Sequence, residues 1–260
     1  MQNSKKGLLP FRHGVPLSND QRPKTQEEEN MMRQVPYASV VGSLMYAMLC
    51  TRPDICYSAS MVNRYQSNPG PKHWQVVKHI LKYFQRTRDY MLVYHSEDLI
   101  LIGYIDSDFQ SNLDFRKSTS GCVFILRGGA ISWRSTKQSC IADSIMEAKY
   151  ATTCEATKEA VWLKKFLFDL GVMRMEQVPI TLFCNNSGVV AQSKNPRNHK
   201  GKHIERKYHI IRDIIARGDV VVAKIESAHN LANPFTKALP QKTFESHLEE
   251  MGVRLVHNSL

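Results

Sequence analysis

Three short apolar runs, rich in β-branched and aromatic residues, follow one another closely in the middle of the chain and constrain its fold more than any other feature. They cover residues 99–105, 121–126 and 130–133, and the turn Arg127-Gly128-Gly129 precedes the last one. Runs of this composition at such short intervals are typical of strands that pair as an antiparallel meander. We therefore expect three consecutive antiparallel strands.

A long amphipathic helix and an alternation of strands and helices follow the meander. The apolar residues of this helix recur on one face until Gly171 ends it: Ala156, Ala160, Leu163, Leu167 and Leu170. After it we expect a strand over 180–184, a helix from Ser187, a basic helix over 202–217 and a strand over 220–225. Three antiparallel strands followed by alternating helices and strands predict an α/β fold with a mixed sheet.

The chain before the meander divides into a polar segment and a small helical unit. Residues 1–35 have little periodic apolar content, so we expect a flexible lead-in. Over 37–84 the pattern is helical, in three stretches that the turn signals TRPD and SNPGPKHW separate, and a strand is expected over 90–94. The predicted division is a lead-in over 1–35, a helical unit over 36–95, an α/β domain over 96–252 and a tail over 253–260.

Composition limits the cellular compartment. Hydrophobic residues make up 42% of the 260, which is enough to bury a real core. The six cysteines show no Cys-x-x-Cys spacing and are expected to be free thiols in a reducing compartment. The sequence contains neither a signal peptide nor an apolar stretch long enough to cross a membrane. We therefore expect an intracellular protein, cytoplasmic or nuclear, that is not secreted and does not contact membranes.

The net charge of +11 fits either a polyanionic partner or a solvated basic surface. One basic segment could contact nucleic-acid phosphates, and its candidate residues are Lys200, Lys202, His203, Arg206, Lys207 and Arg212. The alternative is a solvated helix face. Zinc is not expected here, because His203 and His209 lie far from any cysteine. Trp133 and Trp162 lie in apolar patterns, which predicts that both pack in the core.

Five long strings carry a resemblance to a known family: VGSLMYAMLCTRPDICYSASMVNRYQSNPGPKHW, GYIDSDF, RKSTSGCVFILRGGAISWRSTKQ, GKHIERKYHIIRDII and NPFTKALP. In this order and spacing they resemble plant copia-type retrotransposon Pol polyproteins over nearly the whole chain. Several independent long motifs that agree in order are far more specific than one short pattern. The resemblance implies a ribonuclease H-like fold for residues 96–252, preceded by the small helical unit.

The resemblance also implies two ancestral activities. Residues 36–95 would be a connection-like segment at the end of a reverse transcriptase. A polymerase needs the adjacent aspartates of a Tyr-x-Asp-Asp hairpin, and no Asp-Asp pair occurs in this sequence, so DNA synthesis by this chain is excluded. A ribonuclease H hydrolyses the RNA strand of an RNA–DNA hybrid with two Mg²⁺ ions, which clustered carboxylates hold.

Four positions match the carboxylates that the family uses, and only one of them is acidic here. Asp106 in GYIDSDF is retained, whereas Lys149, Asn185 and Asn233 replace a glutamate and two aspartates. Asp106 is therefore the only expected metal ligand, and the metal site is predicted not to function. Lys149 lies on the inward face of its helix and should pair with Asp106.

Two nearby acids could compensate for these replacements, but neither is expected to do so. Asp108 follows Asp106 by two residues and could share its face of the strand, while Glu147 should point away from the sheet. Even with Asp108, the site would still contain a lysine.

The function expected from the resemblance is a ribonuclease H-like protein that is catalytically dead and binds an RNA–DNA hybrid or other nucleic acid weakly. No cofactor is expected to be bound, although Mg²⁺ is implied for active relatives, and the sequence names no protein partner. One alternative is a residual hybrid ribonuclease that works within a Pol polyprotein. Another is an effector-like protein-interaction module, because stand-alone pieces of this kind are sometimes labelled as secreted RxLR effectors. The chain contains no Arg-x-Leu-Arg string.

Overall fold

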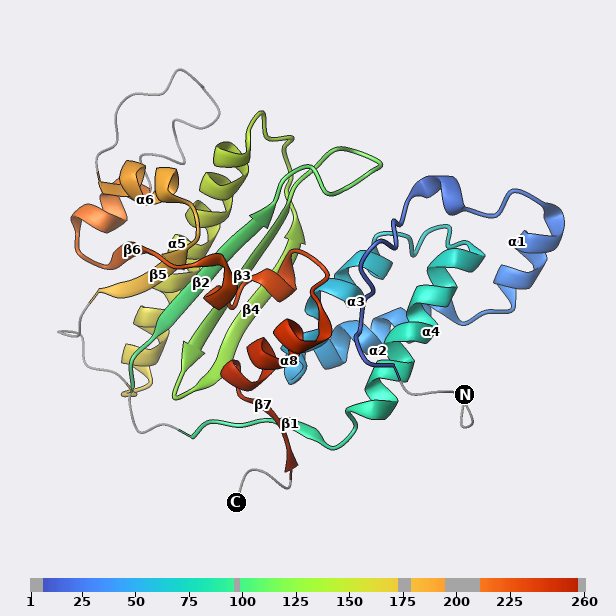
Figure 1. The fold of residues 1–260 in the computed structure, drawn as a ribbon, viewed down its shortest axis with the longest axis horizontal. Helices are drawn as coiled ribbons and strands as arrows, with labels where there is room; N and C mark the ends of the chain where they lie inside the picture. Colours follow the sequence, from blue (N-terminus) through green and yellow to red (C-terminus); the bar gives the residue numbers. More distant parts are fainter. Residues whose placement is uncertain (1–6, 96–98, 173–178, 195–210, 257–260) are drawn as a thin grey trace.

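A computed structural model describes residues 7–95, 99–172, 179–194 and 211–256. At its centre is a five-stranded sheet in the order β4-β3-β2-β5-β6 (Figure 1). The strands are β2 (Ile102–Asp108), β3 (Thr119–Leu126), β4 (Gly129–Lys137), β5 (Ile180–Cys184) and β6 (Val220–Lys224).

The pairing of these strands confirms the predicted mixed α/β fold. Strands β2, β3 and β4 form an antiparallel meander, and β5 lies parallel to β2 and β6 parallel to β5. The strand order therefore has three antiparallel strands on one side and parallel strands on the other. This is the arrangement that the ribonuclease H-like resemblance implied.

One face of the sheet is covered by the long helix α5 (Ile145–Asp169) and by α6 (Ser187–Lys194). The side chain of Ser144 caps α5 by accepting a hydrogen bond from Glu147 N at 3.1 Å. The helix buries four of the five residues predicted for its apolar face: Ala156, Ala160, Leu163 and Leu167.

The prediction that Trp162 packs in the core is wrong. Its side chain is 57% exposed and stacks on Phe166, with ring centroids 5.1 Å apart. Trp162 directly precedes the buried Leu163, and one residue is a rotation of about 100° on a helix, so its side chain leaves the buried face. Trp133 is partly buried against the core, and its indole Nε1 donates to Met48 O at 2.8 Å.

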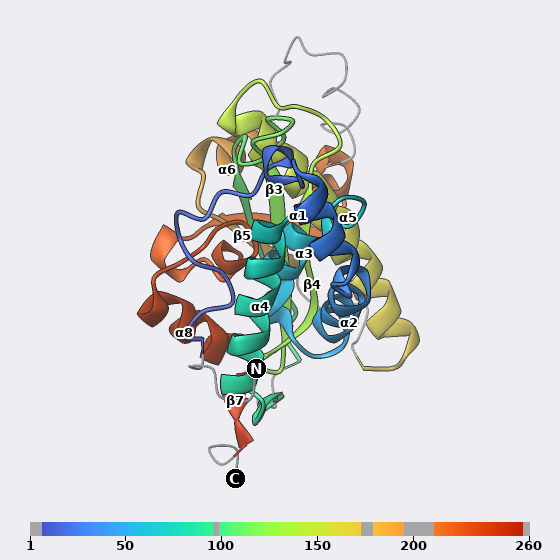
Figure 2. The ribbon, with the colours of Figure 1, turned by 90° about the vertical axis from the view of Figure 1, so that its right-hand side faces the viewer.

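The other face of the sheet and the preceding helices share one hydrophobic core (Figures 1 and 2). The helices are α2 (Tyr37–Cys50), α3 (Cys56–Asn63), α4 (Pro71–Arg86) and the later α8 (Gln241–Glu250). Side chains of β3, among them Val123 and Ile125, belong to the same cluster. The 3-10 turn η2 (Pro53–Ile55) directly precedes α3. The turns η3 (Ser227–His229) and η4 (Asn233–Phe235) lie between β6 and α8.

Two short strands, one before the main-sheet strands in the sequence and one after them, pair with each other. Strand β1 (Tyr90–Leu92) pairs antiparallel with β7 (Val253–Leu255). A strand was predicted over 90–94, but residues 253–255 were predicted as part of a tail. The division of the chain into domains at residues 36, 96 and 253 stays a prediction.

Residues 7–35 pack against the rest of the chain, which differs from the flexible lead-in that the sequence predicted. They contain η1 (Asn19–Gln21) and α1 (Gln26–Arg33), which Thr25 caps. The side chains of Phe11 and Leu17 are buried in the core that the helices share. Isolated apolar residues of this kind leave no periodic signal, although their burial is enough to fix the segment.

None of the helices in the described ranges is long and apolar enough to cross a membrane.

Candidate functional site

The four positions that match the family's carboxylates come together around the end of β2. Asp106 lies on β2 with only 2% of its side chain exposed, and Lys149 approaches it from the first turns of α5. The Lys149 ammonium Nζ donates to Asp106 Oδ1 at 2.9 Å and to Asn185 Oδ1 at 2.8 Å. The ion pair predicted from helical spacing is therefore confirmed.

The second carboxylate oxygen of Asp106 is held by residues that follow η4. Thr236 Oγ1 donates to Asp106 Oδ2 at 2.6 Å, and Lys237 Nζ lies 3.6 Å from the same oxygen. Gly121 pairs with Asp106 across the sheet and permits this approach, because a Cβ atom there would lie 2.7 Å from Thr236 Cγ2. Sequence reasoning missed Thr236 and Lys237, although both stand in the string NPFTKALP directly after Asn233.

Asn185 and Asn233 meet through Ser227 of η3. Asn185 Nδ2 donates to Ser227 Oγ at 3.3 Å, and Asn233 Nδ2 donates to Ser227 O at 2.6 Å. The side-chain oxygen of Asn233 is buried without a hydrogen-bond partner among the described residues. Lys149 therefore contacts both Asp106 and Asn185 directly, whereas Asn233 is linked to Asn185 only through Ser227.

The two neighbouring acids lie as the sequence predicted. Asp108 ends β2 and is partly buried, and burial raises the pKa of its carboxyl, an effect that Lys237 opposes and the charge of Asp106 reinforces. Glu147 turns away from the site, and its Oε2 accepts a hydrogen bond from Asp143 N at 2.8 Å. Within the described ranges, Asp108 is thus the one further carboxylate found beside Asp106, and burial raises its pKa.

The residues present do not fit a Mg²⁺ ion. Such an ion requires near-octahedral oxygen ligands with enough negative charge to neutralise it. Here an ammonium group contacts both Asp106 and Asn185, and the formal charges of Asp106 and Lys149 cancel. Over the described ranges, no group of three or more His, Cys, Asp or Glu side chains could hold a metal ion.

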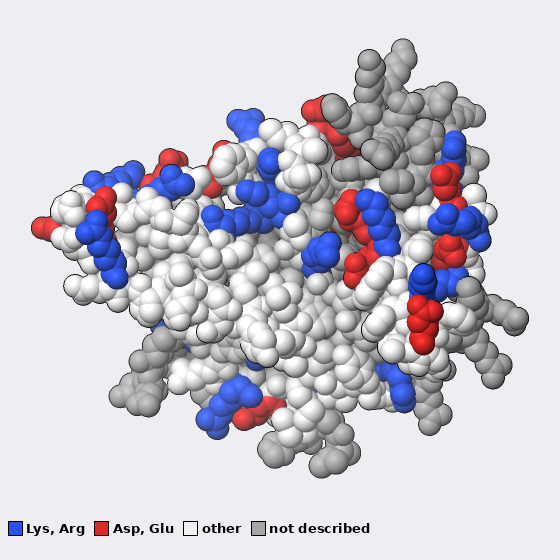
Figure 3. All heavy atoms as spheres, turned by 180° about the vertical axis from the view of Figure 1, so that it is seen from behind, with Lys and Arg blue, Asp and Glu red and all other residues white. Residues whose placement is uncertain are grey.

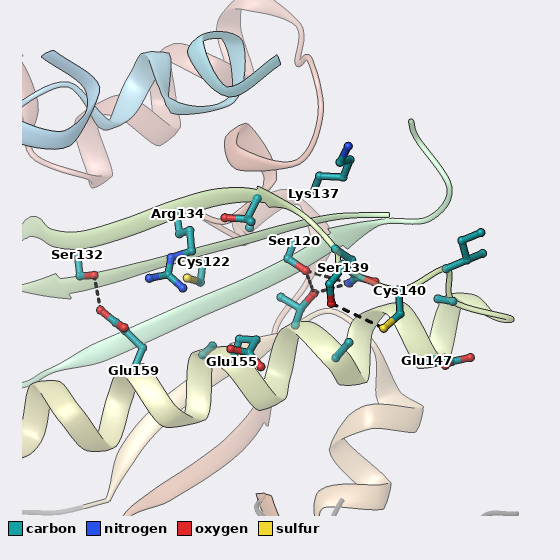
Figure 4. A pocket seen from close by; sticks show the side chains of 18 residues that line it. Ser120, Cys122, Ser132, Arg134, Lys137, Ser139, Cys140, Glu147, Glu155 and Glu159 are labelled. Carbon is teal, nitrogen blue, oxygen red and sulfur yellow. Dashed lines mark hydrogen bonds between the residues drawn. The ribbon is translucent and has the colours of Figure 1, made fainter. Parts of the chain in front are cut away.

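A separate cavity of about 310 Å³ lies between α5 and the strands β3 and β4 (Figure 4). Arg134 points into it from β4, and Glu155 and Glu159 point into it from α5. Ser132 Oγ, which also lines the cavity, donates to Glu159 Oε1 at 3.0 Å. Basic and acidic side chains thus both line this cavity.

The basic residues predicted to contact nucleic acid fall mostly outside the described ranges, namely Lys200, Lys202, His203, Arg206 and Lys207. Arg212 is described and exposed, and it lies 3.7 Å from Asp213. On the face shown in Figure 3, acidic side chains lie among the basic ones at several places. The nucleic-acid contact therefore stays a prediction.

Comparison with known proteins shows close relatives. The chain is 42% identical over 254 residues to the retrovirus-related Pol polyprotein of transposon TNT 1-94 from Nicotiana tabacum, which covers 97% of this chain and 19% of the polyprotein. It is 44% identical over 133 residues to secreted RxLR effector protein 161 from Plasmopara viticola, covering 51% of this chain and 94% of that protein.

Among solved structures, the chain is similar to the LC11 ribonuclease H1 isolated from compost. The TM-score is 0.42 at 15% identity, and the match covers 58% of this chain and 99% of that one. No family model matches the chain. The chain thus spans only about a fifth of the tobacco polyprotein that it resembles.

Proposed function

Since the chain belongs to the Pol polyproteins of copia-type retrotransposons, we propose that its ribonuclease H-like region no longer hydrolyses RNA and at most binds nucleic acid. Residues 96–252 would form this region, and residues 36–95 would be the connection-like end of a reverse transcriptase. The ancestral reaction was hydrolysis of the RNA strand of an RNA–DNA hybrid with two Mg²⁺ ions. Relationship to Pol polyproteins also supports an intracellular location, in the cytoplasm or the nucleus.

The observation that carries this proposal is the position of the Lys149 ammonium between Asp106 and Asn185, at 2.9 and 2.8 Å. Two-metal hydrolysis needs carboxylates that hold cations beside the scissile phosphate. In this chain, Asp106 would have to give up Lys149 on one oxygen and Thr236 on the other before it could bind a metal. The Lys149 ammonium cannot activate a water molecule as a metal ion does.

Weak binding of nucleic acid is the part of the ancestral function that the charge supports. The net charge of +11 favours a polyanion through counterion release, and Lys149 and Lys237 leave the site itself free of the net negative charge that would repel phosphates. Such binding should need no divalent cation and should weaken steeply as salt is raised.

The test is cleavage of a labelled RNA–DNA hybrid in Mg²⁺ or Mn²⁺. We expect no cleavage by the natural chain and recovery of cleavage in the triple variant Lys149→Glu, Asn185→Asp, Asn233→Asp. Adding Asp106→Asn to the triple variant should abolish the recovered activity, which would assign it to this site. Cleavage by the natural chain would overturn the proposal and favour a residual ribonuclease.

A second candidate function is protein interaction. The relative from Plasmopara viticola, of which the chain covers 94%, is named as an effector. The chain also exposes the stacked rings of Trp162 and Phe166, at 57% and 44%, on the outer side of α5. This candidate predicts a protein contact that Trp162→Ala weakens, whereas the first candidate predicts salt-sensitive retention of a hybrid that Trp162→Ala leaves unchanged.

A further inference from the structure

The segment before α1 lies along helix α4 and is fastened to it near both ends (Figure 1). Four hydrogen bonds hold the segment: Gly7 N to Lys82 O at 3.1 Å, Arg86 Nη1 to Leu8 O at 2.7 Å, Tyr65 OH to Leu17 O at 2.8 Å, and the contact of His73 Nε2 with Ser18 O at 3.1 Å. The buried side chains of Phe11 and Leu17 anchor the part between them. The segment is therefore held as a bridge over one face of the helix.

A cavity of about 520 Å³ lies between this bridge and α4, and its ionisable side chains are all basic. They are Arg12 from the bridge and Lys72, Lys78, His79 and Lys82 from α4. Among the residues that the structure describes, no aspartate or glutamate lines the cavity. Its apolar wall includes Phe11 and Val76.

The four fixed cations of this cavity, Arg12, Lys72, Lys78 and Lys82, make no ion pair with any acid in the described ranges. By contrast, Arg86 on the next turn of α4 pairs with Glu245 at 2.6 Å. A basic side chain of α4 thus forms an ion pair where an acidic side chain lies within reach, as Glu245 does for Arg86. Like charges gathered in one cavity repel each other, and an anion would relieve that repulsion.

One ring nitrogen of His79 also lacks a partner within the described ranges. Its Nε2 atom is buried and has no hydrogen-bond partner among the described residues. Burial lowers the pKa of His79, and the charges of Arg12 and Lys82 lower it further, while a hydrogen bond to the backbone of Leu9 opposes this shift. The cavity therefore combines a positive potential with a buried polar atom that has no partner among the described residues.

We propose that this cavity binds a compact anion that carries two or more phosphate groups. Lysine ammonium groups bind phosphate as point charges, and an arginine can engage phosphate oxygens with two parallel hydrogen bonds. The volume lies within the range of small-molecule sites, and Phe11 and Val76 could contact an apolar part of the ligand. The site is remote in sequence from Asp106 and Lys149 and does not depend on whether the chain cleaves RNA.

The test measures binding of inorganic tripolyphosphate by calorimetry at constant ionic strength. We expect one saturable site per chain and a thermal midpoint that rises with ligand concentration, because the ligand binds only the folded state. The double variant Lys78→Gln, Lys82→Gln should lose affinity by about a hundredfold, at roughly tenfold for each charged contact. The matched control Lys158→Gln, Lys165→Gln removes the same charge from α5 and should bind as the natural chain does.

Folding of the variant is checked without ligand. Removing two unpaired cations from a basic cavity should not lower the thermal midpoint of the free protein. An absence of saturable binding, or an equal loss of affinity in both double variants, would overturn the proposal. So would displacement of tripolyphosphate by a single-stranded oligonucleotide that binds more tightly through Lys78 and Lys82, because the ligand would then be a strand.

Discussion

Two buried ion pairs in this chain each join a basic side chain to an aspartate, and they lie in different surroundings. In the helical unit, Arg52 Nη2 lies 2.7 Å from Asp54 Oδ2, and the two side chains are 8% and 0% exposed. In the sheet, Lys149 Nζ lies 2.9 Å from Asp106 Oδ1, and the side chains are 12% and 2% exposed. Burial costs both pairs a large desolvation penalty, so their difference lies in how completely each is hydrogen-bonded.

The Arg52 pair is matched on every side. Arg52 also donates from Nε to Asp54 Oδ1 at 2.9 Å, and Tyr83 OH donates to Asp54 Oδ2 at 2.7 Å. Arg52 Nη2 donates further to Thr87 Oγ1 at 2.6 Å, and its guanidinium carbon lies 4.4 Å from the centroid of the Phe84 ring. This pair therefore stabilises the helical unit as one closed network.

The Lys149 pair leaves polar groups around it unmatched. The side-chain oxygen of Asn233 is buried without a partner among the described residues, and Lys237 stands only loosely at 3.6 Å from Asp106. Burial also raises the pKa of Asp108 nearby. The fold thus accommodates the Lys149–Asp106 ion pair, but not all of the polar groups around that pair are arranged to hydrogen-bond with it.

The largest expected effect is at Asp54. Asp54→Ala leaves the buried guanidinium of Arg52 without its carboxylate, so we expect a loss of about 4 kcal/mol in the free energy of unfolding. Urea denaturation followed by circular dichroism measures it. Asp20→Ala, on the exposed surface, serves as the control and should be close to neutral. A loss at Asp54 below that of Lys149→Met would reverse the comparison.

The comparison extends to His247, a buried histidine of helix α8. Both ring nitrogens of His247 are buried and have no hydrogen-bond partner in the described part of the chain. Burial first, then His229 and Lys237, lowers the pKa of His247 to about 4. The unfolded chain therefore binds the proton more readily, and stability is lost as pH falls from about 6.5 through about 4. We expect a loss on the order of 3 kcal/mol over this window.

The measurement for His247 is urea denaturation at a series of pH values between 4 and 7. His247→Phe should flatten the slope that His247 contributes, while His229→Gln, at an exposed position, should leave most of it. A natural chain whose stability does not change between pH 6.5 and 4.5 would contradict the lowered pKa.

A smaller effect is expected at Lys149. Lys149→Met removes the ammonium from Asp106 but leaves Thr236 and Lys237 in place, so we expect a loss of about 2 kcal/mol. Thermal or urea unfolding compares this variant with Asp54→Ala. A loss as large as that of Asp54→Ala would mean that the two pairs contribute equally, and the distinction between them would fail.

The sequence predicted the parts of this site that depend on local spacing. The order of strands, the buried face of α5 and the pairing of Lys149 with Asp106 all follow from periodicity or from aligned motifs. Thr236 could not be placed in this way, because it reaches Asp106 across 130 positions of chain and only where Gly121 leaves room. The packing of Phe11 was missed for a related reason, since a single apolar residue in a polar segment has no period.

The smallest expected effect tests whether that long-range contact matters. Thr236→Val keeps the shape of the side chain but removes the hydroxyl that donates to Asp106 Oδ2 at 2.6 Å, so we expect a loss of about 1 kcal/mol. Thr87→Val removes the matching hydroxyl at Arg52 and should cost more, because Thr87 Oγ1 also donates to Tyr83 O at 3.0 Å. Urea unfolding of the two variants side by side decides between them. If Thr236→Val proved more costly than Lys149→Met, Asp106 would depend on its hydroxyl partner more than on Lys149, and the site would be organised around the carboxylate and not around the ammonium.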